Sequence, residues 1–247
     1  MATAKIFYNE AGITPTMTNE DGSYPASNLA IENQSIVAKS TGVTTKITWN
    51  LGGAVTVYGV AYFNTSFATA TTVTWQTGTI SATVDSSTNL TKAIDGYNIE
   101  TSAKQYVAIE ITMPAGVCQV GQVYIFCGNG DISDPICPGK ITNTQELIET
   151  ISENNINGHE SKYIYNYYDS FSWDYTNMLW ANVATLKTIA QSNYTCFLPY
   201  GADAGIYYGI YKQGSFVPLT SDTTVGDIHF SSNGHFIECP ASIETLY

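Results

Sequence analysis

The stretch from Tyr24 to Phe63 constrains the fold more than any other part of the chain. Residues 45–51 place apolar side chains at alternate positions, which predicts a strand with one buried face. Residues 54–63 are apolar on both alternating faces, a pattern typical of a strand inside a sandwich. Gly52 and Gly53 separate the two predicted strands, so this stretch predicts the first half of a β-sandwich.

Short apolar runs separated by glycine and polar residues continue through the first half of the chain. The pattern predicts further strands at 5–9, 69–76, 80–84, 105–113 and 120–126. Residues 86–104 are polar and predict a loop. Only 12% of the residues are charged while 18 are tyrosine, a composition that favours strands over surface helices. Many short strands with such punctuation predict a sandwich or jelly roll.

A second unit is predicted after a segment rich in glycine and proline. We expect a β-sandwich at 1–128, a linker at 129–140, and a smaller, strand-rich α+β or β domain at 141–247. The fold class is therefore mainly β. The second domain contains one clear helical pattern, at 177–192, with apolar residues at helical spacing.

Other elements of the second unit are less determined by their pattern. Residues 143–152 fit a helix with a capping box, but a strand is equally compatible. Strands are predicted at 163–168, 195–198, 206–211, 216–219, 227–230 and 235–239. The sequence Ser231-Ser232-Asn233-Gly234 predicts a hairpin turn between the last two.

The charge of the chain excludes two classes of partner. The net charge is −12, with 9 lysines and no arginine. Nucleic acids and anionic membranes require basic residues, so neither is expected as a partner. No run of residues is long and apolar enough to predict a membrane span. The first residues, MATAKIFYNEAG, do not resemble a secretion signal, so we expect synthesis in a cytoplasm without export.

The five cysteines do not form a recognisable motif. Cys118, Cys127, Cys137, Cys196 and Cys239 are widely spaced. We favour reduced and mostly buried thiols, although a disulfide from Cys127 to Cys118 or to Cys137 remains open. Neither Cys196 nor Cys239 lies in a sequence resembling a cysteine protease.

The histidines allow one metal hypothesis. His229 and His235 lie on the two arms of the predicted hairpin, where Glu238 or Asp227 could supply a third ligand. We favour the alternative, a polar pair on an exposed face. His159 is expected in a solvated loop. No metal or other cofactor is therefore predicted.

The carboxylates do not predict an enzyme. Asp131 with Asp134, Asp169 with Asp174, and Glu10 with Glu20 and Asp21 could serve a calcium site or a glycosidase. Solvated loops are the interpretation that we favour. The sequence contains no nucleophile elbow, zinc-protease motif or phosphate-binding loop, so a non-enzymatic protein is expected.

Aromatic residues are the best candidates for contacts with partners. Those of the second unit could stack on sugar rings, or they could form its core and its subunit contacts. The candidate interface or glycan-contact residues are Tyr24, Tyr165, Tyr167, Trp173 and Tyr175.

Several of these segments resemble a known module. Tyr24-Pro-Ala-Ser-Asn-Leu29, Ala38-Lys39-Ser40, Trp49-Asn-Leu-Gly52 and Val57-Tyr-Gly-Val60 together resemble discoidin-like (F5/8 type C, galactose-binding-like) jelly rolls. The strands at 106–111 and 120–126 fit this resemblance. Two positions depart from the family pattern, because Ala38 replaces a tryptophan and Lys39 replaces an arginine.

The same turn, together with the second half of the chain, is similar to tailed-phage virion proteins that carry such a module. This resemblance implies a structural subunit of the virion: a tail-associated protein, an adaptor or a capsid decoration that contacts other virion proteins and copies of itself. The alternative is a carbohydrate-binding module that recognises host glycans through the loops at 19–24 and 65–69.

Overall fold

The computed structural model describes residues 5–8, 13, 15–31, 36–79, 85–90, 96–131, 141–154, 159–191, 195–198, 206–215, 217–218 and 229–238. The chain divides into two compact units, one of residues Phe7–Asn129 and one of Met1–Ile6 with Gly130–Tyr247. The predicted strand at 80–84 and the histidine partner Asp227 lie outside the described residues.

The first unit is a β-sandwich built on one sheet. Its strand order is β3-β8-β4-β7-β5-β6, with β2 added to β4, and the paired strands are antiparallel. The strands are β2 (Thr16–Met17), β3 (Ala38–Lys39), β4 (Thr44–Thr65), β5 (Thr72–Gly78), β6 (Ser86–Asn89), β7 (Gly96–Thr112) and β8 (Gln119–Phe126). Short 3₁₀ turns cover Ala26–Ala30 and Phe67–Thr69. The predicted fold class, mainly β with a β-sandwich in the first unit, is confirmed.

The stretch from Tyr24 to Phe63 contains one long strand where two were predicted. β4 runs through the two glycines, and its pairing with β7 is interrupted between Asn50 and Val55. Gly52 takes a positive φ of 78°, and its N–H donates to Asn50 Oδ1 at 2.9 Å. The glycines therefore produce an irregularity within a strand instead of a turn between strands.

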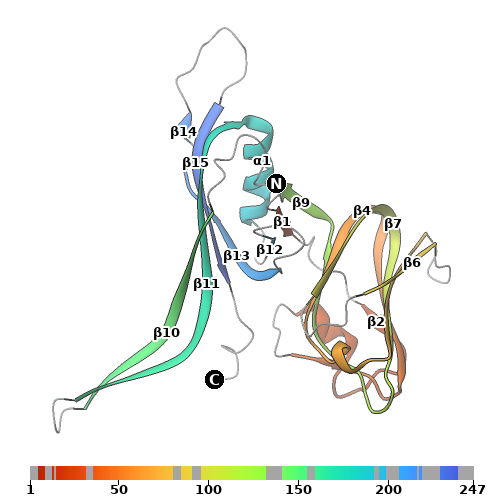
Figure 1. Cartoon of the computed structure of the whole chain (residues 1–247). Coiled ribbons are helices and arrows are strands. Elements are labelled where there is room, and N and C mark those ends of the chain that lie inside the picture. The colour runs from red at the N-terminus through yellow and green to blue at the C-terminus, as the bar shows by residue number, and fades with distance from the viewer. Residues whose placement is uncertain are drawn as a thin grey trace. The chain divides into compact units, whose positions relative to one another are not determined.

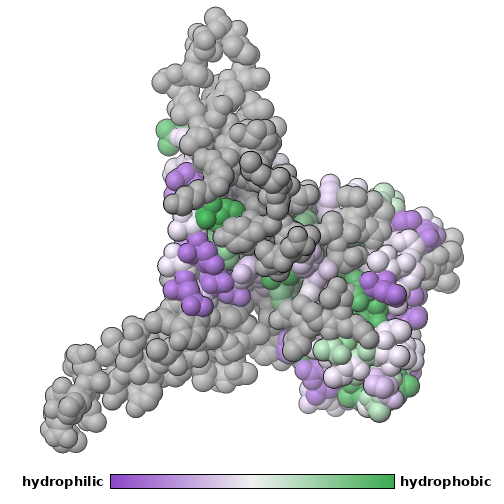
Figure 2. Space-filling model, in the orientation of Figure 1, coloured by the Kyte–Doolittle hydropathy of each residue, from purple (hydrophilic) through white to green (hydrophobic). Residues whose placement is uncertain are grey.

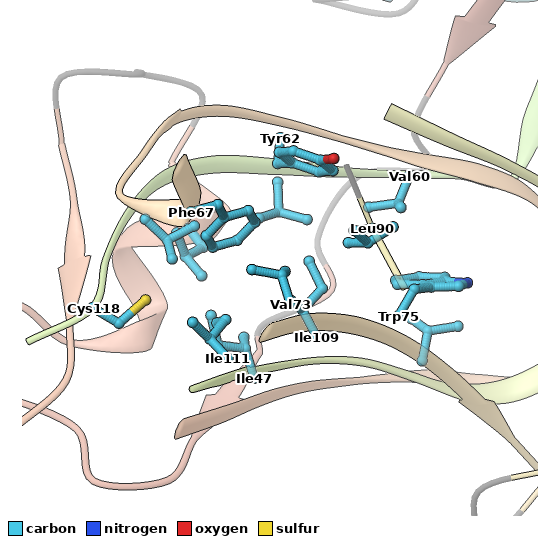
Figure 3. Close-up of a cluster of buried hydrophobic side chains, with 14 of the residues drawn as sticks. Ile47, Val60, Tyr62, Phe67, Val73, Trp75, Leu90, Ile109, Ile111 and Cys118 are labelled. Atoms are coloured by element: carbon cyan, nitrogen blue, oxygen red, sulfur yellow. The ribbon is translucent and has the colours of Figure 1, made fainter. Parts of the chain in front are cut away.

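The long strand allows one sheet to supply both layers of the sandwich. In Figure 3, Val60 and Tyr62 from the second half of β4 lie across the core from Ile47 in its first half. Trp49, Val57 and Val60 are buried, and the partly buried Leu51 packs against the same core. Residues 86–104, predicted to be a loop, include β6 and the start of β7 instead.

The described residues of the second unit form a second sheet and an α-helix. The sheet order is β10-β11-β15-β13-β12-β1-β9, with β14 beside β15. The strands are β1 (Lys5–Tyr8), β9 (Gly128–Asp131), β10 (Thr142–Asn154), β11 (His159–Leu179), β12 (Thr195–Leu198), β13 (Tyr207–Gln213), β14 (Val217–Pro218) and β15 (His229–Glu238). Residues 143–152 are therefore strand and not helix. The predicted helix exists as α1 (Trp180–Gln191), which buries Val183, Leu186 and Ile189.

The hairpin predicted at 231–234 is wrong, because β15 continues through these residues. Gly234 lies opposite Trp173 of β11 and opposite Gln213 of β13. A Cβ at position 234 would lie 2.4 Å from Trp173 Cε2. The Asn-Gly pair therefore reflects the close approach of an aromatic ring to a strand rather than a turn. As a consequence, His229 and His235 lie on the same strand and do not face each other.

β10 and β11 extend beyond the rest of the second sheet as a two-stranded ribbon (Figure 1). Their pairing runs from Thr142 opposite Ser172 to Asn154 opposite His159. Within the described residues, β15 pairs with β11 only from Ser170 onward. His159, expected in a loop, is the first residue of β11.

Candidate functional sites

Four loop segments of the sandwich meet at one end, which we call the loop end: residues 19–24, 39–43, 65–70 and 113–119. The start of β8 connects them. Gln119 pairs with Lys39, and its carbonyl accepts the Ser66 N–H at 2.9 Å. The Cys118 carbonyl accepts the Ser40 N–H at 3.0 Å. The two loops predicted to recognise glycans are therefore neighbours.

Tyr24 is the exposed aromatic residue of the loop end. Its backbone is fixed, because its N–H donates to the Asp21 carbonyl at 2.8 Å and its carbonyl accepts the Lys39 N–H at 3.0 Å. Tyr24 is 40% exposed, and Lys39 Nζ lies 4.0 Å from the centroid of its ring. The arrangement presents an aromatic ring and a cation together on a rigid backbone.

The carboxylates beside Tyr24 serve the backbone. Glu20 Oε2 accepts the Ala26 N–H at 2.9 Å, and Asp21 Oδ1 accepts the Ser23 N–H at 2.9 Å. These bonds hold the turn that begins at Tyr24. Glu10 and Asp134, two further candidates for calcium ligands, lie outside the described residues. In the parts of the chain that the structure describes, no cluster of three or more His, Cys, Asp or Glu could hold a metal.

No disulfide joins any two of the described cysteines Cys118, Cys127 and Cys196. Cys118 is buried under the loop end, where burial raises the pKa of its thiol to about 11, while a hydrogen bond with Ser66 acts in the opposite direction. Burial likewise raises the pKa of Cys196 well above its ordinary value. Cys127 is partly exposed, and no disulfide joins it to Cys118. The pKa shifts oppose thiolate formation at Cys118 and Cys196.

A polar groove lies on the second sheet. It has a volume of about 630 Å³ and is lined by Thr142, Ser172, Trp173, Asp174, Asn233, Gly234 and His235. We call it the β11–β15 groove. Figure 2 shows hydrophilic side chains gathered over this part of the sheet on the visible face. Sequence reasoning considered Asp174 and His235 separately but did not group them, because strand register alone brings them together.

The register divides the sheet into a polar face and an aromatic face. Thr142, Ser172 and His235 are directly opposite one another on three adjacent strands, so they share a face. Asp174 and Asn233 form the next row on that face. Trp173 lies between the rows in sequence and packs on the other face, where its ring stacks 5.2 Å from Phe197 and 5.9 Å from Tyr211.

The candidate aromatic residues of the second unit lie in different environments. Trp173 and Tyr175 are buried, with 3% and 4% of their surface exposed. Their rings form an edge-to-face pair 6.3 Å apart. Tyr165 and Tyr167 belong to the ribbon part of β11, and their side chains lie outside the described set. Tyr24 thus belongs to the first unit and the other four to the second.

His235 is oriented by a serine. Ser170 Oγ and His235 Nε2 are 2.6 Å apart. Ser170 is only 6% exposed, so its hydroxyl orients the imidazole and is not presented as a nucleophile. Glu238 accepts the Asp169 N–H at 2.8 Å. Burial and the Asp169 carboxylate raise the pKa of Glu238, and that hydrogen bond partly offsets them.

No helix among the described residues is long and apolar enough to cross a membrane.

Comparison with known proteins identifies similar solved structures but no family. No family model and no curated protein matches the chain. A chitosan-binding module of a chitosanase/glucanase from Paenibacillus sp. IK-5 is 19% identical over 49% of this chain and 98% of its own, with a TM-score of 0.40. A fucose-binding module from Streptococcus pneumoniae is 9% identical over 49% and 96%, with a TM-score of 0.44. The CBM32 module of AlyQ, solved with 4,5-unsaturated mannuronic acid, is 21% identical over 48% and 98%, with a TM-score of 0.39.

Proposed function

We propose that the chain is a non-enzymatic carbohydrate-binding protein that contacts host surface glycans through the loop end of its sandwich. The observation that supports this proposal is the Tyr24 ring, 40% exposed and held by backbone hydrogen bonds beside Lys39. A ring held in this way loses little conformational entropy when a ligand packs on it.

The chemistry of the loop end suits a sugar. A sugar ring has an apolar face that can pack on an aromatic ring, and hydroxyls that hydrogen-bond at its rim. Tyr24 supplies both an apolar surface and a phenolic hydroxyl. Lys39 supplies three donors, and Thr41 is exposed on the adjacent loop. One aromatic contact with a few hydrogen bonds gives weak binding to a single site, so copies presented together would bind more tightly.

A glycan array probed with the full chain tests this proposal. We expect binding to a restricted set of glycans, and we expect Tyr24→Ala to weaken it at least tenfold while Tyr24→Phe retains most of it. Val217→Ala, which removes another exposed apolar side chain from the second unit, is the matched control. The absence of any signal with a multivalent, fluorescently labelled form of the protein would refute the proposal.

A second candidate function is a structural subunit of a bacteriophage virion, as a tail-associated protein, adaptor or capsid decoration. The observation that favours it is the two-stranded ribbon, which residues 145–154 of β10 form with residues 159–169 of β11. A two-stranded ribbon is marginally stable in water by itself, and a third strand or a packed face stabilises it. Contact with another virion protein or another copy of this chain would supply that face. Glycan binding and assembly are compatible, because receptor-binding proteins are also parts of virions.

Light scattering and electron microscopy of the purified chain test the assembly proposal. We expect a concentration-dependent oligomer, and we expect Leu147→Ser combined with Tyr167→Ser, a cross-strand pair in the ribbon, to shift it toward monomer. Gln145→Ser, nearer the sheet, is the control. A protein that stays monomeric at every concentration, together with antibodies that label no phage particle, would exclude this function.

A further inference from the structure

We infer that the β11–β15 groove is a second saccharide site, which binds a neutral, polyhydroxylated ligand across three strands of the second sheet. The inference rests on the proposed carbohydrate-binding function, and it extends that function to the other unit. Nothing in the sequence patterns had grouped the residues that line the groove.

The two rows of side chains provide the hydrogen-bonding groups. Thr142 and Ser172 carry hydroxyls that donate and accept, Asn233 carries an amide that does both, and Asp174 accepts only. Thr142, Ser172, Asp174 and Asn233 are exposed. Neighbouring strands are about 4.8 Å apart. The groups therefore form a grid that can bond several hydroxyls of one ligand.

His235 contributes a fixed imidazole whatever its tautomer. Ser170 contacts Nε2, and Nδ1 has no hydrogen-bond partner among the described residues. If Ser170 donates to Nε2, then Nδ1 carries the proton and donates to a ligand. If Nε2 donates to Ser170, then Nδ1 accepts. A sugar hydroxyl can complement either state, because it both donates and accepts.

The charges indicate a neutral ligand. Among the described residues that line the groove, Asp174 is the carboxylate, and Lys212 of β13 lies opposite His235 on the same face. One negative and one positive side chain nearly balance. The chain as a whole has a net charge of −12. A polyanionic ligand would gain little from this groove and would be repelled by the whole protein.

The floor of the groove is rigid. The Trp173–Gly234 pair lies between the two polar rows, and the indole packs so closely on Gly234 that a Cβ there would lie 2.5 Å from Nε1. Stacking of Trp173 against Phe197 and Tyr211 holds the strands from the other face. The polar groups are consequently positioned before a ligand arrives, which lowers the entropic cost of binding.

Saturation-transfer NMR and calorimetry on the full chain test the groove, with lactose, cellobiose and diacetylchitobiose as neutral probes and a uronic-acid disaccharide as the acidic probe. Four proteins are compared: wild type, Tyr24→Ala, Asp174→Ala with Asn233→Ala, and the triple variant. Thr144→Ala, an exposed residue on the same strand as Thr142, is the control. Circular dichroism confirms that each variant is folded.

The inference predicts that Tyr24→Ala retains a component of binding to a neutral probe, and that the added groove substitutions reduce it at least tenfold. Loss of all binding in Tyr24→Ala would overturn the groove while supporting the loop end. Binding that ignores Tyr24 but requires Asp174 and Asn233 would support the groove and refute the loop end. A preference for the acidic probe, or no binding of any probe by wild type, would overturn the inference.

Discussion

The two units differ in what surrounds their buried tryptophans. In the sandwich, Trp49 and Trp75 belong to a core of mainly aliphatic side chains, in which Tyr62 and Phe67 also form a ring pair 5.1 Å apart. Figure 3 shows Trp75 among aliphatic residues that come from both layers. In the second sheet, the rings contact one another: Phe171 and Phe197 are 5.2 Å apart, and Trp173 stacks on Phe197 and Tyr211. A mixed core depends mainly on buried volume, whereas a core of stacked rings also depends on their orientation.

The difference has a consequence for substitutions. In the sandwich, the largest losses of stability should come from removing volume. In the second sheet, adding a single methyl group should be damaging wherever a ring lies against the backbone. Cys118 and Cys196, buried thiols in different units, allow the opening of each unit to be measured separately by alkylation.

Trp75→Ala should have the largest effect. Trp75 is fully buried near Leu90, Val60 and Ile109 (Figure 3). Truncating a buried tryptophan removes its transfer free energy and leaves a cavity, which costs about 4 kcal/mol of unfolding free energy. Urea unfolding measures the loss, and Cys118 should become faster to alkylate. Trp75→Phe should lose much less, and a loss below about 1 kcal/mol for the alanine variant would contradict the mixed-core description.

Gly234→Ala should have the next largest effect. The new methyl group would meet the indole of Trp173 at 2.4 Å, so the ring must leave its stack. Overpacking of this kind costs about 2 kcal/mol. Alkylation should accelerate at Cys196. Gly53→Ala, where nothing lies within 4 Å of the new Cβ, is the matched control and should cost far less.

An unchanged rate of Cys196 alkylation in Gly234→Ala would show that the ring stack is not what determines the stability of the second sheet. If alkylation of Cys118 accelerated to the same degree in Gly234→Ala, the result would contradict the distinction between the two units.

The sandwich could be predicted from the sequence because its signals are local. Alternation at Ile47 and Trp49 follows the two-residue period of a strand, and residues 59–63 are apolar on both faces. The same reasoning separated β4 into two strands, because a glycine with positive φ at position 52 reads as a turn until its partner strand is known.

The groove could not be predicted, because its residues meet only through long-range register. Thr142, Ser172 and His235 are widely spaced in sequence and are joined by pairing among three strands. The Asn233-Gly234 pair pointed to a hairpin, since a turn is the commonest local reason for that dipeptide. Its actual reason, the indole of Trp173, lies about sixty residues away along the chain.

Glu238→Gln should change stability less than Trp75→Ala or Gly234→Ala does, and it should raise stability instead of lowering it. Burial raises the pKa of Glu238, so the folded state favours the protonated form, and the charged form destabilises it at neutral pH. The contribution is favourable below the ordinary glutamate pKa and is lost as pH rises through the folded value. The glutamine variant should be more stable at pH 7 by less than about 1 kcal/mol, because the carboxyl is only partly buried and solvent screens it.

Thermal unfolding from acid to neutral pH measures the effect of Glu238→Gln, and its advantage should disappear in acid. The glutamine oxygen can still accept the Asp169 N–H, so the hydrogen bond is retained. A variant less stable than wild type at neutral pH would show that the carboxylate stabilises the second sheet and would reverse the interpretation.

Lys104→Ala should have the smallest effect. Lys104 Nζ lies 3.0 Å from Asp85 Oδ2 on the surface of the sandwich, and this hydrogen bond is the main reason that the pKa of Asp85 is lowered. A lowered carboxyl pKa stabilises the folded state above the unfolded pKa, and the stabilisation is lost as pH falls through the folded value. Any difference in unfolding free energy between the variant and wild type should therefore be largest near neutral pH and disappear in acid. It should also shrink at about 1 M salt, where exposed charges are screened.

A double-mutant cycle with Asp85→Asn isolates the ion pair from the other contact of Asp85. That contact is a hydrogen bond in which Asp85 Oδ2 accepts the Thr79 N–H at 2.9 Å, and Lys104→Ala does not remove it. A coupling that persists in high salt would place this pair among the interactions that hold the sandwich together, in contrast to its exposed position.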